Sequence, residues 1–185
     1  MPRPPAAVGW REEAIARAHD RRGFDCGVPD LNAYLTRYAR QNHELGVGKT
    51  FVAIPEQPPQ VGGPIPVLGY YSLSAGELDH RRVPGEVTRR LPRYPLPVVR
   101  LARLAIDRRH QGAGLGGQLF LSAGERAFAV AEQAGVVALA IDAKDEAAAK
   151  WYERFGASRL LDDPLSLVLP LGVIEAALRA RKPRG

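Results

Sequence analysis

A glycine-rich turn between an apolar segment and an amphipathic one most limits the folds open to this chain. Val98–Ile106 has apolar residues at both alternating positions and predicts a strand that is buried on much of both faces. This segment runs directly into the glycine-rich residues 107–116. Leucine and alanine then recur every four residues from Leu115 to Ala131, and Gly135 is suited to follow the end of a helix. The sequence therefore predicts a strand, a glycine turn and a helix of about 20 residues.

Shorter segments complete the pattern on either side of this unit. Apolar residues at i, i+3, i+4 and i+7 predict a helix over roughly 30–44, with Asp30 as its N-cap. Asp142 or Asp145 is expected to cap another helix, whose apolar face holds Ala148, Trp151, Tyr152 and Phe155. Further strands are expected at 50–54, 67–74, 136–141 and 166–169, and a terminal helix at 173–181. This order predicts the α/β class, with helices covering a mixed sheet.

The length of 185 residues fits one globular domain over 1–185, with a flexible leader of about 1–10 and a basic tail of about 181–185. Cys26 is the only cysteine, so an intramolecular disulfide is impossible and no metal site is expected. No apolar run approaches the ~20 residues of a membrane span, and the N-terminus lacks a secretory apolar region. We therefore expect no membrane association and a cytoplasmic location.

Positive charge is concentrated in one segment of the chain. The whole chain carries a formal net charge of +6. From His80 to His110 there are nine arginines against Glu86 and Asp107, so this segment alone carries 9 − 2 = +7. Such an excess attracts the phosphates of a nucleotide cofactor or of a nucleic acid. A solvated arginine-rich loop is the alternative interpretation.

The glycine turn has the features of an anion-binding site. Glycines let the backbone approach a ligand closely, and the first N–H groups of the following helix have no intrahelical acceptor. No Gly-Lys-Ser/Thr ends the turn, which excludes a Walker A loop. Gly112-x-Gly114-x-x-Gly117 formally matches a dinucleotide fingerprint, but the turn does not follow the first strand, and Asp142 lies later than that fold requires.

Arg109-His110-Gln111-Gly112-Ala113-Gly114 at the head of a helix resembles the pyrophosphate motif of the GCN5-related N-acetyltransferases (GNAT). The resemblance covers roughly residues 50–170. It implies a GNAT fold, with a central mixed, twisted sheet that is flanked by helices and splayed at an acetyl-CoA cleft. It also implies that the following residues bind acetyl-CoA: Leu104, Ala105, Ile106, Arg109, His110, Gln111, Gly112, Ala113, Gly114, Leu115 and Gly116.

A second motif supports the same resemblance. Asp145-x-x-Ala148-x-x-Trp151-Tyr152-x-x-x-Gly156 is similar to the family's Asn-x-x-Ala-x-x-Leu-Tyr-x-x-x-Gly-Phe, in which the tyrosine hydroxyl approaches the thioester sulfur. The chain departs from the family at Asp145 and at Ala157, where the family often has Asn and Phe. The resemblance implies that Tyr152 is catalytic. Simple packing of Tyr152 in an apolar helix face is the alternative.

Further segments narrow the resemblance to acetyltransferase toxins of bacterial toxin–antitoxin pairs. These are Phe24-Asp25-Cys26-Gly27, Gly69–Leu73, Val99–Gly116, Trp151–Gly156 and Leu169-Pro170-Leu171. Toxins of this branch acetylate the α-amine of aminoacyl-tRNA and halt translation, and a small ribbon-helix-helix antitoxin partners them; homodimers are common in the family.

On this interpretation, five arginines are the expected contacts for tRNA phosphates: Arg89, Arg90, Arg93, Arg100 and Arg103. Arg37, Arg40 and Lys49 are further candidates for the same role. Two other functions stay open from the sequence. One is a GNAT enzyme that acetylates a small-molecule amine or a protein N-terminus. The other is a nucleic-acid-binding module that keeps the fold without turnover.

Overall fold

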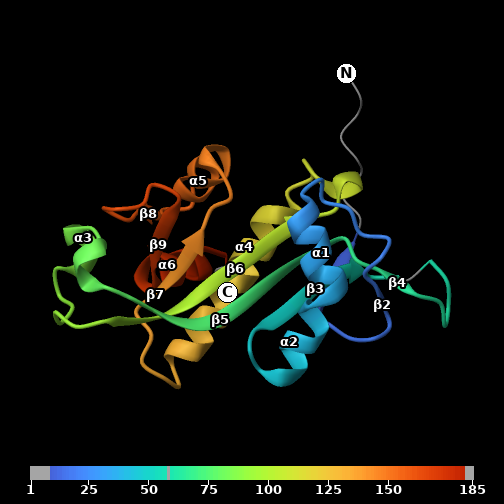
Figure 1. Cartoon of the computed structure of the whole chain (residues 1–185), viewed down its shortest axis with the longest axis horizontal. Helices are drawn as coiled ribbons and strands as arrows, with labels where there is room; N and C mark the ends of the chain where they lie inside the picture. Colours follow the sequence, from blue (N-terminus) through green and yellow to red (C-terminus); the bar gives the residue numbers. More distant parts are fainter. Residues whose placement is uncertain (1–8, 58, 182–185) are drawn as a thin grey trace. The chain divides into compact units, whose positions relative to one another are not determined.

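A seven-stranded mixed sheet confirms the predicted α/β class (Figure 1). The computed structural model describes residues 9–57 and 59–181, so most of the expected leader and tail lie outside the described residues. The strand order is β1-β3-β5-β6-β7-β9-β8, and β2 and β4 form a separate parallel pair. The strands are β1 Trp10–Ala14, β2 His19–Asp20, β3 Lys49–Pro55, β4 Ile65–Pro66, β5 Gly69–Leu78, β6 Leu96–Ile106, β7 Ala138–Asp142, β8 Ser158–Arg159 and β9 Ser166–Pro170.

Six α-helices and two short 3-10 turns accompany the strands in the described residues. They are α1 Pro29–Arg37, α2 Ala39–Leu45, η1 His80–Arg82, α3 Gly85–Thr88, η2 Arg108–His110, α4 Leu115–Ala131, α5 Glu146–Glu153 and α6 Leu171–Arg181. The chain divides into two compact units, one of Met1–Ser74 with Arg103–Phe120 and the other of Ala75–Ala102 with Leu121–Gly185. Each unit is described separately, and the single domain over the whole chain stays a prediction.

The first unit contains the antiparallel strands β1, β3 and β5. Its core packs helices α1 and α2 beside these strands through Leu35, Ala39, Val52, Ile54 and Tyr70, which are all 0% exposed. Strand β1 was not predicted, because residues 1–20 alternate proline, charge and alanine and carry no clear strand pattern. Its pairing with β3, from Trp10 opposite Pro55 to Ala14 opposite Phe51, supplies the stabilisation that the local sequence lacks.

The helix expected over 30–44 is two helices, and Asp30 is not its N-cap. Val28 occupies the N-cap with extended dihedral angles, and Pro29, whose fixed φ suits the first turn, begins α1. The break lies at Tyr38, with φ −117°. Two residues before it, the Thr36 hydroxyl donates to Asn32 O at 2.9 Å, a side-chain bond that often bends helices.

The second unit is built around β7, whose residues Ala138–Ile141 are buried. Strand β7 pairs in parallel with β6 and antiparallel with β9, which also pairs with β8. Apolar residues of β6, β7 and β9 form a core with Leu78, Val83 and Leu160. The expected elements at 136–141, 166–169 and 173–181 are confirmed to within two residues at each end.

Within the described residues, no helix combines the length and apolar character that crossing a bilayer requires.

The N-cap of α5 provides a test of the helix signal at Asp145. Its side chain accepts a hydrogen bond from Ala148 N at 2.7 Å, and its ion pair with Lys144 at 3.6 Å is exposed and contributes little. Asp145→Ala should lower the free energy of unfolding by about 1 kcal/mol in urea titrations, because the first-turn N–H loses its acceptor. Asp145→Asn keeps an acceptor and should stay close to wild type. Equal losses in both variants would assign the effect to charge instead of capping.

Candidate active site

The predicted turn follows β6 as the sequence indicated, and its glycines have the conformation that the argument required. Gly112 and Gly114 have φ of +77° and +85°, which other residues rarely adopt. A side-chain carbon added at either glycine would meet no atom within 4 Å. The backbone is therefore open to a ligand at both positions.

The start of α4 presents unused backbone donors beside these glycines. Its first backbone bond runs from Gln118 N to Gly114 O at 3.3 Å, so the N–H groups of Leu115, Gly116 and Gly117 precede the hydrogen-bonded ladder. The positive end of the helix dipole adds to their attraction for an anion. Open glycines and three helix donors fit the diphosphate of a coenzyme.

The end of β6 continues past its pairing with β7. The register between these strands runs from Val98 opposite Ala138 to Leu101 opposite Ile141, whereas β6 extends to Ile106. Ala105 is buried in the core of the first unit, and Leu104 and Ile106 are half-buried. The segment expected to bind the coenzyme arm thus belongs to the part of β6 beyond this pairing.

Tyr152 lies on α5 in the second unit and is 8% exposed. The Trp151 ring packs edge-on against the Tyr152 ring, with 5.0 Å between the centroids. Burial raises the pKa of the Tyr152 phenol above its ordinary value of about 10. The phenol is therefore protonated at neutral pH and is able to donate a hydrogen bond.

The rest of the predicted apolar face of α5 is only partly correct. Ala149 and Tyr152 are the buried residues of the helix, whereas Ala148 and Trp151 are half-buried. Phe155 lies beyond the end of the helix at Glu153 and is 40% exposed. The regular spacing was extended one turn too far.

Comparisons with known proteins agree with this geometry. Residues 73–157 match the family described as Acetyltransferase (GNAT). A tRNA-acetylating toxin of Mycobacterium tuberculosis (strain ATCC 25618 / H37Rv) is 36% identical over 155 residues, which cover 84% of this chain and 88% of that protein. The chain belongs to the GNAT family of acetyltransferases. It is therefore an N-acetyltransferase that uses acetyl-CoA.

Solved GNAT structures extend the likeness over most of the chain. AtaT complexed with acetyl-methionyl-tRNAfMet is 26% identical, with a TM-score of 0.83, over 91% of this chain and 99% of that one. A tyrosine-to-phenylalanine variant of the AtaT toxin, bound to the C-terminus of the antitoxin AtaR and acetyl-CoA, is also 26% identical. Its TM-score is 0.76, over 91% of this chain and 98% of that one.

One buried carboxylate holds the GNAT turn in shape. Asp107 is 1% exposed and follows β6 directly. It accepts hydrogen bonds from the Arg109 guanidinium at 2.8 and 2.9 Å, from Arg109 N at 3.0 Å and from Asp25 N at 3.1 Å. Burial raises the pKa of Asp107, but these donors outweigh burial, and the net pKa is lowered.

The loop Phe24-Asp25-Cys26-Gly27, from the N-terminal part of the chain, contacts the same turn. Arg108 N donates to Asp25 O at 2.8 Å, and the Arg108 guanidinium lies 3.4 Å from the Asp25 carboxylate. The Gln111 side chain donates to Cys26 O at 3.1 Å and to Ile106 O at 2.9 Å. Gly27 has φ +86° and lies against the Arg108 side chain. Phe24-Asp25-Cys26-Gly27 therefore supports the turn between β6 and α4, and the Cys26 side chain is buried in the core.

Sequence reasoning assigned Arg109 and Gln111 to coenzyme binding and did not identify Asp25 or Asp107. The Arg109 guanidinium also donates to Gly23 O at 3.1 Å, so most of its donors are engaged within the protein. His110 is half-buried, and its N–H donates to Asp107 O at 2.8 Å. Arg109, His110 and Gln111 thus shape the turn through contacts within the protein. The backbone at Gly112 and Gly114 remains open to a ligand.

The charged segment 80–110 is far less positive than its sequence sum indicates. Five of its nine arginines form ion pairs, namely Arg81 with Asp79, Arg82 with Asp162, Arg100 with Asp142, Arg108 with Asp25 and Arg109 with Asp107. The Arg103 guanidinium lies 3.6 Å from the centre of the Tyr34 ring, which is a cation–π contact. Arg89, Arg90 and Arg93 are exposed.

Replacement of Asp107 tests its control of the turn. Asp107→Asn should lower the free energy of unfolding at pH 7 by about 1.5–3 kcal/mol, the value of hydrogen bonds to a charged group. Because the folded pKa is lowered, this contribution is present above the unfolded pKa of about 3.9 and is lost as the pH falls through the folded pKa. Urea unfolding at neutral and acidic pH measures both effects.

Asp79 offers a matched control in the second unit. It caps η1 as Asp107 caps η2, accepting from Arg81 N and pairing with the Arg81 guanidinium. Its side chain is 39% exposed, against 1% for Asp107. Asp79→Asn should therefore destabilise the protein less and leave acetyl-CoA affinity unchanged, whereas Asp107→Asn should weaken it. Equal acetyl-CoA affinities in both variants would exclude a role for Asp107 in shaping the turn.

Proposed function

We propose that this GNAT enzyme acetylates the α-amine of aminoacyl-tRNA and acts as a toxin by blocking translation. The proposed substrate rests on one observation, the similarity over most of the chain to a tRNA-acetylating toxin and to AtaT in complex with acetyl-methionyl-tRNAfMet. The proposal includes a cytoplasmic location, where charged tRNA is found.

The chemistry of the amine supports this choice of substrate. A model α-amino group has a pKa of about 7.7–8.0, whereas a lysine side chain has a pKa near 10.4. Esterification of the amino acid lowers the first value further, so the amine of a charged tRNA is substantially neutral at pH 7. The coenzyme motifs contain His110, Glu146 and Glu153 as candidate bases, and both glutamates pair with Arg159, at 2.8 and 2.7 Å. Positioning of the amine then supplies most of the rate enhancement.

The acetyl donor is assigned to the turn and the strand before it. Backbone N–H groups from Gly112 to Gly117 hold the diphosphate, and the open glycines and helix donors described above support this role. The backbone of Leu104, Ala105 and Ile106 pairs with the extended arm of the coenzyme, as an added strand would. Acetyl-CoA, when bound, supplies an activated thioester. Arg109, His110 and Gln111 act by keeping the turn in shape.

Tyr152 is the proposed general acid. As the amine nitrogen bonds to the acetyl carbon and the C–S bond breaks, Tyr152 Oη would donate its proton to the departing sulfur, and the proton released by the acetylated nitrogen would restore the phenol. The phenol stays protonated across the neutral range, so its hydroxyl is able to donate a hydrogen bond there.

The nucleic acid and protein partners are also proposals. Among the expected tRNA contacts, Arg89, Arg90 and Arg93 remain the best supported, since Asp142 and Tyr34 engage Arg100 and Arg103. A small ribbon-helix-helix antitoxin is the proposed inhibitor, by likeness to the AtaT toxin with the C-terminus of AtaR. A homodimer is the proposed assembly.

Incubation with radiolabelled acetyl-CoA and a pool of charged tRNA tests the function. The wild-type protein should label aminoacyl-tRNA, and Tyr152→Phe should lower kcat by about 10²–10⁴ because packing is kept and the proton donor is lost. Acetyl-CoA affinity, measured by calorimetry, should not change in this variant.

Two results would contradict these assignments. Labelling of a small amine or a protein N-terminus in preference to charged tRNA would show that the enzyme has a different substrate. If Tyr152→Phe kept the wild-type turnover, the Tyr152 phenol would not be the proton donor of the reaction.

Gly112→Val tests the coenzyme turn. Valine at φ +77° forces the backbone to change, so the N–H groups lose their arrangement. Calorimetry should show at least about a tenfold loss of acetyl-CoA affinity, which is about 1.4 kcal/mol. Gly46→Val is the matched control, because Gly46 has φ +75° and similarly open space at the end of α2. An equal loss in the control would show a general effect of strain.

A further inference from the structure

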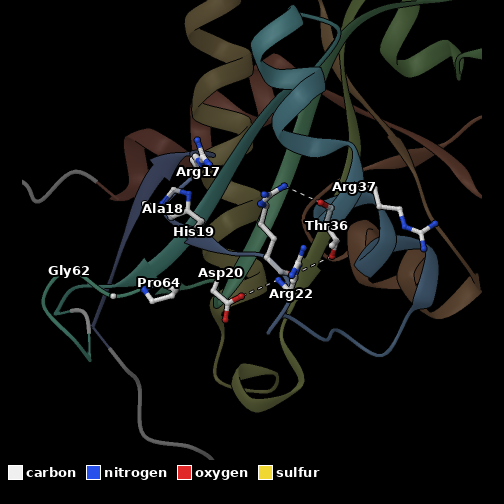
Figure 2. Close-up of a pocket in the computed structure, with 11 residues that line it drawn as sticks. Arg17, Ala18, His19, Asp20, Arg22, Thr36, Arg37, Gly62 and Pro64 are labelled. Carbon is white, nitrogen blue, oxygen red and sulfur yellow. Dashed lines mark hydrogen bonds between the residues drawn. The ribbon is translucent and has the colours of Figure 1, made fainter.

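A positively charged cavity in the first unit belongs to none of the coenzyme motifs. It has a volume of about 720 Å³, within the range of roughly 300–1,000 Å³ that ligand sites occupy. The segment around β2, the end of α1 and the turn before β4 surround it (Figure 2). Its lining residues are Arg17, Ala18, His19, Asp20, Arg21, Arg22, Thr36, Arg37, Gly62, Gly63 and Pro64.

The arginines of this cavity differ from those of segment 80–110, because most of their charge is not offset. Among the residues that the structure describes, Arg17, Arg22 and Arg37 pair with no carboxylate, and all three are exposed. Asp20 is the only acidic lining residue, and its Oδ1 accepts from Arg22 N at 3.1 Å and Gly23 N at 3.0 Å. The cavity thus presents four guanidinium groups against one carboxylate.

The fourth arginine fixes the wall of the cavity. Arg21 donates from Nη1 to Thr36 O at 3.0 Å, and the Thr36 hydroxyl oxygen lies 3.2 Å from Arg21 O. Arg21 Nε is buried and has no partner within the described residues. On the other side, the His19 ring accepts from Ala16 N at 2.9 Å and lies 3.2 Å from Glu13 Oε2. The Arg21–Thr36 contacts hold the arginine-bearing segment against α1, and the Glu13 contact joins it to β1.

The chemistry of the lining favours phosphate groups of a nucleic acid. Guanidinium groups bind phosphate in a planar, bidentate manner, and several separate ones suit successive phosphates of a backbone. A protein partner is less well served, because its binding energy would come from aromatic or aliphatic anchors, and Ala18 and Pro64 are the only apolar lining residues.

We propose that this cavity binds phosphates of the RNA backbone and forms a second contact surface for tRNA beyond Arg89, Arg90 and Arg93. The inference rests on the proposed function for the identity of the RNA. It assigns Arg17, Arg22 and Arg37 to phosphate contacts and Arg21 to positioning of the wall.

The test is the salt dependence of binding to deacylated tRNA. In filter-binding titrations at ~0.1 M salt, the variant R17Q/R22Q/R37Q should bind at least about tenfold more weakly than wild type. Its plot of log affinity against log salt should lose about 2–3 units of slope, since each phosphate contact contributes roughly 0.7–0.9.

The control R11Q/R81Q/R179Q removes the same net charge. Each of these three arginines is paired with a nearby carboxylate, of Glu13, Asp79 or Glu175. This variant should keep the wild-type slope and bind tRNA within about twofold of wild type. Melting temperatures of both triple variants establish that they fold.

Three outcomes would overturn the inference. The first is equal loss of affinity in both triple variants, which would reduce the effect to net charge. The second is an unchanged slope in R17Q/R22Q/R37Q. The third is loss of binding to a polyglutamate peptide with tRNA affinity retained, which would assign the cavity to an acidic protein segment. Because deacylated tRNA accepts no acetyl group here, failure of acetyl transfer in the labelling assay is a separate result that concerns only the proposed function.

Discussion

The turn between β6 and α4 depends on a single buried carboxylate. Asp107 gathers donors from Arg109 and from Asp25 N, and so joins the end of β6 to a loop that lies about eighty residues earlier in the chain. Desolvation of a carboxylate is expensive, so Asp107 stays charged only while these donors surround it. The same bonds that stabilise the charge fix the direction in which the chain leaves the strand. That direction in turn sets the positions of Gly112, Gly114 and the start of α4.

Within the turn, different groups shape the backbone and remain open to an anion, although the sequence pattern assigned both roles to the same residues. Arg109 and Gln111 belong to the motif that resembles a pyrophosphate site, yet their side chains bind Asp107, Gly23 O, Cys26 O and Ile106 O. The donors open to a diphosphate are backbone N–H groups, which carry no side-chain entropy and need no reorganisation. An inner network of hydrogen bonds and an open outer backbone together have the features that a preorganised anion site requires.

Local signals explain which features could be predicted from the sequence. The β6–turn–α4 unit and the Asp145 cap depend on residues within a few positions of one another, and their expected form is confirmed. Strand β1 and the role of Asp107 depend on partners far along the chain, which no periodicity reveals. The net charge of segment 80–110 overstated how much positive charge is left unpaired, for the same reason. Its arginines are adjacent in sequence, but the carboxylates of Asp25, Asp142 and Asp162 that offset three of them come from other segments.

The distribution of charge also bears on how such an enzyme could select a large substrate. An amine that is already neutral requires little from a catalytic base, so discrimination has to come from binding energy at groups remote from the reaction. Arginines that are paired with carboxylates have their charge offset and contribute little to that energy. Unpaired arginines retain their full attraction for phosphate, and Arg17, Arg22 and Arg37 are of this kind although they lie outside the most basic stretch of the sequence. The number of arginines in a segment is therefore a poor guide to an RNA surface, and the number left without carboxylate partners is a better one.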